Sequence, residues 1–320
     1  MTIPFLTADR LAALATYPDV VGFLERALRS GEVDPEVDSP RLFSPAPRGE
    51  FLVMPTSGQT WSGVKLLTIA PENPARGLPK IQGVYTLFAS DDLAPRVLMD
   101  AVELTLLRTP ATTVTAIKHL LAAGPDLGPE PIRVVVVGTG PQAERHLHCL
   151  SAVLDRPLDV AVTGRRPGAA EAFAERMSGH EGLAVRAGTP DDVRDAAVVL
   201  CVTSSSTPVL DDALVAADAV VAAIGSHGAQ RAELPAALVR RGDVAVEARA
   251  SAMREAGNLL QARTGEEWSA LPVANLSDLV NGRFERTPGR PAIFSGVGMA
   301  WEDLVVATAL YQRHQETDGQ

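Results

Sequence analysis

Three cationic residues stand where a charge is costly to bury. Arg41 lies in the proline-flanked segment SPRLFSP, Lys65 is centred in the apolar run SGVKLLTIA, and Arg108 ends the apolar segment LTLLR. A lysine in such a run either extends to solvent from an edge strand or faces an anion inside the protein. Guanidinium groups bind carboxylates through two parallel hydrogen bonds, and an ammonium adds a further charge-assisted donor. From their surroundings alone, these residues are candidates for facing an anion, with an edge-strand lysine as the alternative for Lys65.

A second candidate site is the turn GTGPQA, which contains Gly138, Gly140, Gln142 and Ala143. In a dinucleotide-binding unit the first glycine makes a tight turn and the second lets the backbone approach the pyrophosphate. The third small residue lets the helix pack closely. The N–H groups at the helix N-terminus then bind the diphosphate. An ordinary glycine turn would explain the motif alone, but the strand-like run at 132–137 before it favours a dinucleotide site.

The end of the next apolar run indicates which dinucleotide binds. An NAD enzyme usually has an acidic residue there for the ribose 2′-hydroxyl, whereas a 2′-phosphate is bound by guanidinium. This run ends in Gly164, Arg165 and Arg166 and has no acid. NADP is therefore favoured over NAD as the cofactor, with two solvated surface arginines as the alternative.

The glycine turn and the arginine pair lie in a part of the chain where strands and helices are predicted to alternate. Beyond Gly124, apolar runs alternate with alanine-rich segments, which predicts an α/β fold with a Rossmann-type, doubly wound parallel sheet over residues 125–295. We expect six strands, at 132–137, 158–163, 183–187, 198–203, 219–224 and 244–247.

The first part of the chain has a different pattern, which predicts an α+β substrate-binding and dimerisation domain. Residues 1–30 indicate helices, 31–50 an extended loop, and short apolar runs from Phe51 a meander of strands. A helical pattern over 100–123 is expected to break near Pro110. From Phe294 we expect a glycine-containing loop followed by a helix that returns to the first domain. The predicted domains are 1–124 with 296–320, and 125–295.

Composition excludes several classes of protein. The chain has 320 residues, with 29 Lys and Arg against 39 Asp and Glu, a formal net charge of −10, and 4% aromatic residues. Negative charge and few stacking side chains argue against nucleic acid as a partner. No segment is long and apolar enough for a membrane helix, and we expect no membrane partner. Two cysteines and no secretory signal favour the cytoplasm, and the histidine and cysteine spacing indicates no metal site.

Six segments together resemble the ornithine cyclodeaminase/mu-crystallin family. The resemblance covers nearly the whole chain, and its LRTxAT and GxK blocks are specific. The segments are MPTSGQTWSGVKLLTIAPENP (54–74), LTLLRTPATT (104–113), GTGPQAERHL (138–147), CVTSSSTPVL (201–210), AIGSHGAQRAEL (223–234) and FSGVGMAWEDL (294–304).

The resemblance implies an NAD(P)-dependent homodimer whose first domain pairs the subunits and holds an imino or amino acid substrate. By motif, Arg41, Lys65 and Arg108 match carboxylate ligands, and Lys65 is the candidate proton donor in imine reduction. Burial and neighbouring arginines would lower its pKa toward the working pH. The resemblance implies cofactor contacts at Arg108, Thr109, Gln142, Thr203, Ser204, Gly296 and Val297. Together with Gly138, Gly140, Ala143, Arg165, Arg166 and Gly225, these residues make up the expected cofactor site. The family commonly has Ser where Gly296 stands.

Two departures from the family narrow the expected activity. Ornithine cyclodeaminases have a catalytic Asp where this chain has His227, and an acid where it has Leu52. We therefore expect reduction of a C=N bond alpha to a carboxylate, in a cyclic ketimine such as Δ1-pyrroline-2-carboxylate or Δ1-piperideine-2-carboxylate. His227 either donates a proton or shapes the pocket. The alternatives are an alanine dehydrogenase-like amino-acid dehydrogenase, an ornithine or lysine cyclodeaminase, and a non-catalytic, crystallin-like NADPH-binding protein.

Overall fold

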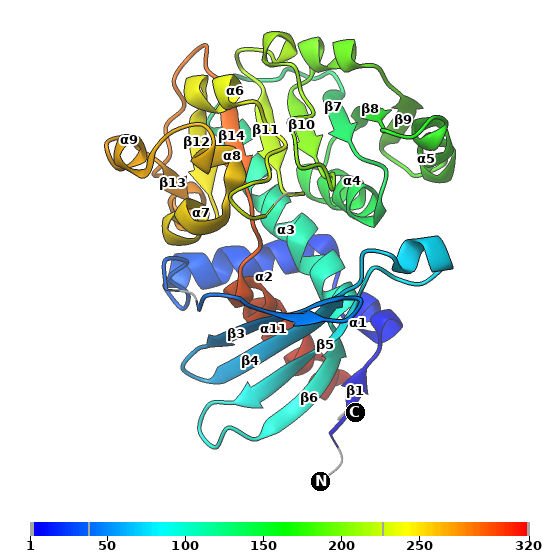
Figure 1. Ribbon diagram of the computed structural model, residues 1–320, viewed down its shortest axis with the longest axis vertical. Coiled ribbons are helices and arrows are strands. Elements are labelled where there is room, and N and C mark those ends of the chain that lie inside the picture. Colours follow the sequence, from blue (N-terminus) through cyan, green and yellow to red (C-terminus); the bar gives the residue numbers. More distant parts are fainter. Residues whose placement is uncertain (1–2, 38, 226, 319–320) are drawn as a thin grey trace. The chain divides into compact units, whose positions relative to one another are not determined.

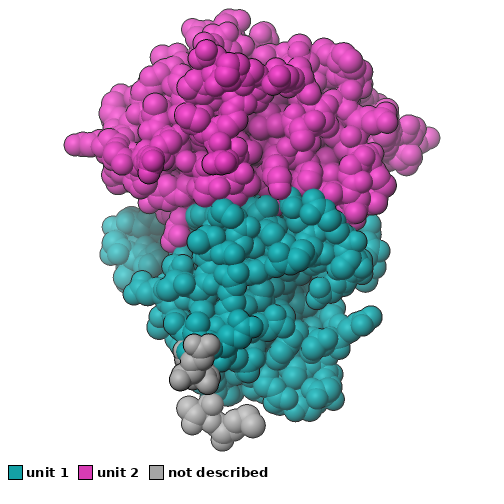
Figure 2. Space-filling view, turned by 180° about the vertical axis from the view of Figure 1, so that it is seen from behind, with its two compact units in different colours: residues 1–112, 299–320 teal, residues 113–298 magenta. Residues whose placement is uncertain are grey.

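The computed structural model describes residues 3–37, 39–225 and 227–318, and the chain divides into two compact units (Figures 1 and 2). Unit 1 comprises residues 1–112 and 299–320, and unit 2 comprises residues 113–298. The first division falls inside helix α3 (Ala101–Ala122), several residues before the boundary expected from the sequence. The difference arises because α3 is continuous, so no linker marks the change of unit.

Unit 1 is built on a six-stranded sheet with the order β1-β6-β5-β4-β3-β2. Its strands pair antiparallel except for β1 and β6, which are parallel. Helix α11 packs against β3, β4 and β5 on one face of this sheet, and α2 packs against α11 (Figure 1). Besides the start of α3, its elements are β1 (Phe5–Leu6), α1 (Ala8–Leu14), α2 (Tyr17–Ser30), β2 (Leu42–Ala46), β3 (Gly49–Ser57), β4 (Trp61–Ile69), the 3₁₀ helix η1 (Asn73–Arg76), β5 (Ile81–Ala89), β6 (Pro95–Asp100) and α11 (Ala300–Asp318).

Two predictions for this part of the chain were wrong. The segment 31–50 is not an uninterrupted loop, since it contains β2 and the start of β3. Proline is tolerated in β2 at Pro45 because β2 is an edge strand that pairs with β3 alone. The helix at 100–123 also does not break, and Pro110 lies inside α3.

A side chain from another helix compensates for the proline in α3. Pro110 has no N–H to donate to the carbonyl four residues before it, that of Leu106. The Tyr17 hydroxyl donates to this carbonyl at 3.2 Å. The acceptor that proline leaves without its helical partner is thereby satisfied, and α3 continues through Arg108 and beyond.

Unit 2 contains an eight-stranded parallel sheet with the order β13-β12-β14-β11-β10-β7-β8-β9. Every residue of β10, β11 and β14 is buried, as expected for strands covered on both faces. Its elements are β7 (Ile132–Val137), α4 (Pro141–Leu154), β8 (Leu158–Thr163), α5 (Ala169–Met177), β9 (Leu183–Ala187), η2 (Pro190–Asp195), β10 (Val198–Cys201), η3 (Asp212–Leu214), β11 (Val220–Ala223), α6 (Ala236–Arg241), β12 (Asp243–Val246), α7 (Arg249–Glu255), α8 (Gly257–Leu260), α9 (Gly265–Ser269), β13 (Ala274–Asn275), α10 (Leu276–Val280) and β14 (Ala292–Ser295).

The α/β fold with a Rossmann-like parallel sheet is confirmed, but the expected six strands were too few. Strand β14 lies between β11 and β12, and β13 adds an edge. Phe294 is therefore a buried strand residue and not the start of a loop. The short sequence AIFS was missed because it has a single β-branched residue and carries a weak strand signal.

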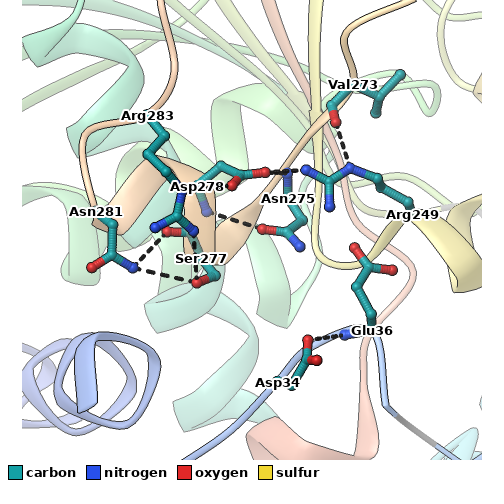
Figure 3. A network of polar contacts seen from close by, with 9 residues as sticks. All are labelled: Asp34, Glu36, Arg249, Val273, Asn275, Ser277, Asp278, Asn281 and Arg283. Atoms are coloured by element: carbon teal, nitrogen blue, oxygen red, sulfur yellow. Dashed lines mark hydrogen bonds and ion pairs between the residues drawn. The ribbon is translucent and has the colours of Figure 1, made fainter. Parts of the chain in front are cut away.

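A carboxylate anchors the short helix α10 in unit 2. Asp278 accepts from the backbone N–H of Asn275 at 3.0 Å, and the Asn275 side chain accepts from the Asp278 N–H at 2.9 Å, which completes a capping box. Asp278 also pairs with Arg249 and, at 2.9 Å, with Arg283 (Figure 3).

Among the helices of the described ranges, none is long and apolar enough to cross a membrane.

Candidate functional site

Lys65 lies in the interior of the unit 1 sheet. Strand β4 has β3 and β5 as neighbours, and Lys65 is paired with Met54 on one side and Tyr85 on the other. Directly opposed residues of antiparallel strands point to the same face, so these three side chains form one row. The relative exposure of Lys65 is 1%. The alternative of a lysine extending to solvent from an edge strand is therefore wrong.

Two adjacent acids of helix α11 pair with Lys65 and Arg108. Asp303 places one carboxylate oxygen 2.7 Å from Lys65 Nζ and the other 3.1 Å from Arg108 Nε. Glu302 lies 2.6 Å from Arg108 Nη1. Both acids are fully buried. Sequence reasoning missed them, although two acids in the otherwise apolar segment MAWEDLVVATAL were a usable signal, since buried carboxylates are rare unless they are paired.

The surroundings of Lys65 shift its proton affinity. Burial, and then the positive charge of Arg108, lower its pKa from 10.5 to about 8, while Asp303 and Glu302 oppose this shift. Burial and the charge of Asp303 raise the pKa of Tyr85 well above its usual value, which keeps its phenol neutral. An ammonium with a pKa near 8 is a stronger acid than an ordinary lysine, so it is better suited to donate a proton near neutral pH.

The structure brings Lys65 and Arg108 together through Asp303. Two positive and two negative side chains give this buried cluster no net charge, so the acids of α11 balance the charges of Lys65 and Arg108. Arg41 lies half-buried, one residue before β2. Because Leu42 pairs with Val53, continuing that register by one residue places Arg41 opposite Met54, at the end of the row that contains Lys65.

The turn between β7 and α4 in unit 2 has the geometry of a phosphate-binding loop. Gly138 has φ +128°, and a Cβ there would lie 2.7 Å from the Val202 carbonyl oxygen, so a side chain is excluded. Gly140 is the N-cap of α4 without a side-chain cap, and a Cβ there would meet nothing within 4 Å. Ala143 is fully buried. A helix N-terminus without a side-chain cap, next to open space at Gly140, fits a diphosphate.

The loop after β8 carries the two arginines expected at the ribose end of a dinucleotide. Arg165 and Arg166 are both exposed in the described structure. Strand β8 ends at Thr163, whose carbonyl accepts from the Gly138 N–H at 2.9 Å, so this loop starts beside the phosphate-binding turn. An anionic group bound there would meet guanidinium groups and no acid from residues 163–168.

A buried glutamate holds the loops that follow β10 and β11. Glu233 accepts at 2.7 Å from the Thr203 N–H and hydroxyl and from the Gly225 N–H. Only glycine fits at position 225, since a Cβ there would lie 2.0 Å from the Thr203 carbonyl oxygen. Asn258 accepts from the Glu233 N–H at 2.8 Å and donates to Ser295 at 3.1 Å. Glu233 therefore ties together the carboxyl ends of neighbouring strands, where α/β sheets bind ligands.

A second buried glutamate holds the loop after β14. Glu247 accepts from the Val297 N–H at 2.7 Å and from the Gly298 N–H at 2.8 Å. A Cβ on Gly296 would lie 3.0 Å from its carboxylate. Sequence reasoning missed both glutamates, although Glu247 directly follows the strand run VAV, where an acid at a sheet edge is a recognisable signal.

The remaining candidate residues take separate positions. His227 is exposed in the loop after β11, and Ser204 is exposed after β10. Thr109 is half-buried on α3 next to Arg108, and Gln142 is half-buried in the first turn of α4, where its carbonyl lies 2.7 Å from the His146 ring. Within the described ranges, no group of three or more His, Cys, Asp or Glu side chains could hold a metal ion.

Comparison with known proteins decides the family. The model of the ornithine cyclodeaminase/mu-crystallin family matches residues 4–318. The chain belongs to this family. It is 32% identical over 310 residues to Δ1-pyrroline-2-carboxylate reductase 2 of Burkholderia ambifaria, covering 94% of this chain and 93% of that protein. It is also 32% identical over 304 residues to a Δ1-pyrroline-2-carboxylate/Δ1-piperideine-2-carboxylate reductase of Azospirillum brasilense, with the same coverage of both chains.

The fold is shared with a solved structure. An archaeal alanine dehydrogenase dimer with bound NAD superposes with a TM-score of 0.86 and 23% identity, covering 99% of this chain and 98% of that chain. This likeness agrees with the combination of an eight-stranded parallel sheet and a six-stranded mixed sheet described above. The family resemblance read from the sequence is thus confirmed.

Proposed function

We propose that the protein is an NAD(P)H-dependent reductase of a C=N bond alpha to a carboxylate, with cyclic ketimines as substrates. The observation that carries this proposal is the buried Lys65, with its lowered pKa, held beside Arg108 by a shared carboxylate. The names of the relatives at 32% identity support Δ1-pyrroline-2-carboxylate and Δ1-piperideine-2-carboxylate as the two substrates.

Each part of the reaction has a candidate residue. Arg41 and Arg108 bind the substrate carboxylate, since guanidinium offers paired donors to its two oxygens. Lys65 Nζ–H donates a proton to the imine nitrogen, which becomes the amine of a cyclic amino acid. A reduced nicotinamide, when bound, supplies the hydride that the imine carbon accepts. His227 is a second candidate donor or a wall of the pocket.

The cofactor site is proposed at the carboxyl edge of the unit 2 sheet. Gly138, Gly140 and the first turn of α4 would hold the diphosphate. Thr203, Ser204, Gly225, Gly296 and Val297 are proposed contacts for the nicotinamide half, and their loops are fixed in part by Glu233 and Glu247. We propose NADPH over NADH because Arg165 and Arg166 follow β8 without an acid.

The residues at two positions disfavour the cyclisation of a diamine. Leu52 is buried on β3, on the same sheet face as Met54 and Lys65, where an acid would be expected to bind a second amine. His227 stands where cyclodeaminases are expected to have Asp. Neither position has a carboxylate for a diamine substrate. The reduction of a preformed imine does not require an acid at either position.

We also propose that two copies of the chain pair through the outer face of the unit 1 sheet. The face opposite Lys65 carries the apolar residues Leu42, Phe51, Val53, Leu66 and Val84. The relative exposure is 60% for Leu42, 40% for Phe51 and 39% for Leu66. A contiguous apolar surface of this kind usually meets another protein surface. The archaeal relative of the same fold is a dimer, which agrees with this proposal.

A substrate panel tests the proposed reaction. The protein is incubated with NADPH and, separately, with Δ1-pyrroline-2-carboxylate, Δ1-piperideine-2-carboxylate, or pyruvate with ammonia, and absorbance of the reduced nicotinamide is followed. We expect rapid oxidation with one or both cyclic imines. Oxidation with pyruvate and ammonia alone would instead identify an amino-acid dehydrogenase, and tight NADPH binding without turnover on any of them would identify a binding protein.

A further inference from the structure

The carboxylate of Asp303 bridges Lys65 and Arg108. The Lys65 side chain is 1% exposed, and its Nζ lies 2.7 Å from a carboxylate oxygen of Asp303. The other oxygen of the same carboxylate lies 3.1 Å from Arg108 Nε. Asp303 is itself fully buried, so salt screens this ion pair only weakly.

The charged and titratable groups around Lys65 come from three elements. Helix α11 contributes Asp303 and Glu302, helix α3 contributes Arg108, and strand β5 contributes Tyr85 in the directly opposed position. Burial and Arg108 favour the neutral amine, while the two acids favour the ammonium. Glu302 has its ion pair with Arg108, so Asp303 is the acid in direct contact with Nζ.

We propose that Asp303 is a positioning residue that orients the Lys65 ammonium and keeps it protonated at neutral pH. Asp303 does not itself touch the substrate in this scheme, and it acts through Lys65. The two opposing effects on the Lys65 pKa complement each other. Burial makes the ammonium a stronger acid, while Asp303 keeps it protonated so that it has a proton to donate. The catalytic consequence rests on the proposed function, but the effect of Asp303 on Lys65 does not.

The proposed proton transfer runs from Lys65 to the imine nitrogen. One Nζ–H bond of Lys65 breaks and an N–H bond forms on the imine nitrogen. The hydride that the imine carbon needs would be supplied by a reduced nicotinamide held by the residues proposed above. Lys65 is left as a neutral amine and Asp303 remains a carboxylate. Water returns a proton to Lys65 before the next turnover, and the Asp303 carboxylate favours this return by stabilising the ammonium.

The composition of the chain makes a direct test possible. It contains three lysines, Lys65, Lys80 and Lys118, so ¹⁵N labelling of lysine gives three side-chain signals whose titrations are followed by NMR in the intact protein. In Asp303→Asn we expect the pKa of Lys65 to fall by more than one unit, while Lys80 and Lys118 titrate as before. Glu302→Gln is the matched control, because this equally buried neighbour pairs with Arg108, and it should move Lys65 less.

The outcomes separate this inference from the proposed function. A folded Asp303→Asn protein in which Lys65 titrates as in the wild type would overturn the inference. If Lys65 shifts as expected and the wild type reduces no cyclic imine, the proposed function is wrong and the inference stands. If both hold, the alkaline limb of the kcat profile moves to lower pH in Asp303→Asn together with the pKa of Lys65.

A measurement on the wild-type protein covers the case in which Asp303→Asn does not fold. The side-chain carboxyl carbon of Asp303 is followed by ¹³C NMR through the same pH range. We expect it to change with the midpoint at which Lys65 loses its proton, because the two groups are in contact. A carboxyl signal that does not respond to the Lys65 titration would overturn the inference.

Discussion

Asp303 joins Lys65 to Arg108, with one carboxylate oxygen 2.7 Å from the Lys65 ammonium and the other 3.1 Å from the Arg108 guanidinium. This single residue links strand β4 to helix α3 through helix α11. The pairing converts two separate cations of the sequence into one buried cluster, whose charges balance and whose lysine has a pKa lowered to about 8.

Replacing Glu233 is expected to weaken the cofactor site without unfolding unit 2. In Glu233→Gln, the amide cannot accept all three hydrogen bonds from Thr203 and Gly225, so the loops after β10 and β11 lose their anchor. Hydrogen bonds to a charged group contribute about 1.5–3 kcal/mol each, so we expect the KM for NADPH to rise about tenfold or more. The KM for the imine should change much less.

Asp278→Asn is the control for Glu233→Gln. Asp278 is also a carboxylate of unit 2 that anchors a loop, but its partners Arg249, Asn275 and Arg283 surround helix α10. We expect Asp278→Asn to lower thermal stability and to leave the KM for NADPH near the wild-type value. Equal effects of both variants on the two KM values would refute a specific role for Glu233.

Arg165 and Arg166 are expected to determine the preference for NADPH. Replacing both with Ala removes the guanidinium groups proposed for the 2′-phosphate, so kcat/KM with NADPH should fall about 10- to 100-fold while the value with NADH changes little. Arg194→Ala, an exposed arginine elsewhere in unit 2, serves as the control. A wild-type protein that already uses NADH more efficiently would contradict the proposed preference.

His146 is expected to make the stability of unit 2 depend on pH. Burial lowers its pKa from 6.5 to about 4. Between these values the unfolded chain binds a proton that the folded chain does not, so stability falls as the pH decreases from 6.5 and levels off below 4. One such group contributes up to about 1.4 kcal/mol per pH unit. Denaturant unfolding of His146→Gln at pH 7 and pH 5 should show a smaller loss than the wild type.

His314→Gln is the control for this experiment, because His314 lies on α11 of unit 1. Its denaturant unfolding should show the same loss between pH 7 and pH 5 as the wild type. A His146→Gln protein that loses as much stability on acidification as the wild type would show that His146 does not cause the effect.

The outer face of the unit 1 sheet is expected to hold two subunits together. Leu66→Glu places a charge in the middle of this apolar face and should convert a dimer into a monomer in light-scattering measurements of mass. Leu271→Glu is the matched control, since Leu271 of unit 2 is 41% exposed against 39% for Leu66. A Leu66→Glu protein that stays dimeric would place the interface elsewhere.

Much of the fold could be predicted because the information is local. The run IRVVVV at 132–137 and the turn at Gly138 and Gly140 carry their structure in a few adjacent residues, and β7 and α4 follow as expected. Strand β14 and the unbroken helix α3 could not be predicted in this way. The first depends on its place between β11 and β12, and the second on a hydroxyl from Tyr17, far away in the sequence.

The candidate site shows the same division. Lys65 and Arg108 were identifiable because a cation in an apolar run is unusual. Their partners Glu302 and Asp303 lie nearly 200 positions after Arg108 in the sequence, so no spacing rule connects them. The acidic pair in α11 was visible as an anomaly, but its partners became known only when the sheet and both helices were in place.

The most direct test of the central claim compares Lys65→Met with Lys80→Met in the reduction of Δ1-pyrroline-2-carboxylate by NADPH. Met keeps an apolar stem of similar length at the buried position and removes the proton donor, while Lys80 is an exposed lysine of the same unit. We expect kcat to fall about 10²- to 10⁴-fold in Lys65→Met and to stay near the wild-type value in Lys80→Met. A folded Lys65→Met protein with near-normal kcat would contradict a role for Lys65 in the reaction.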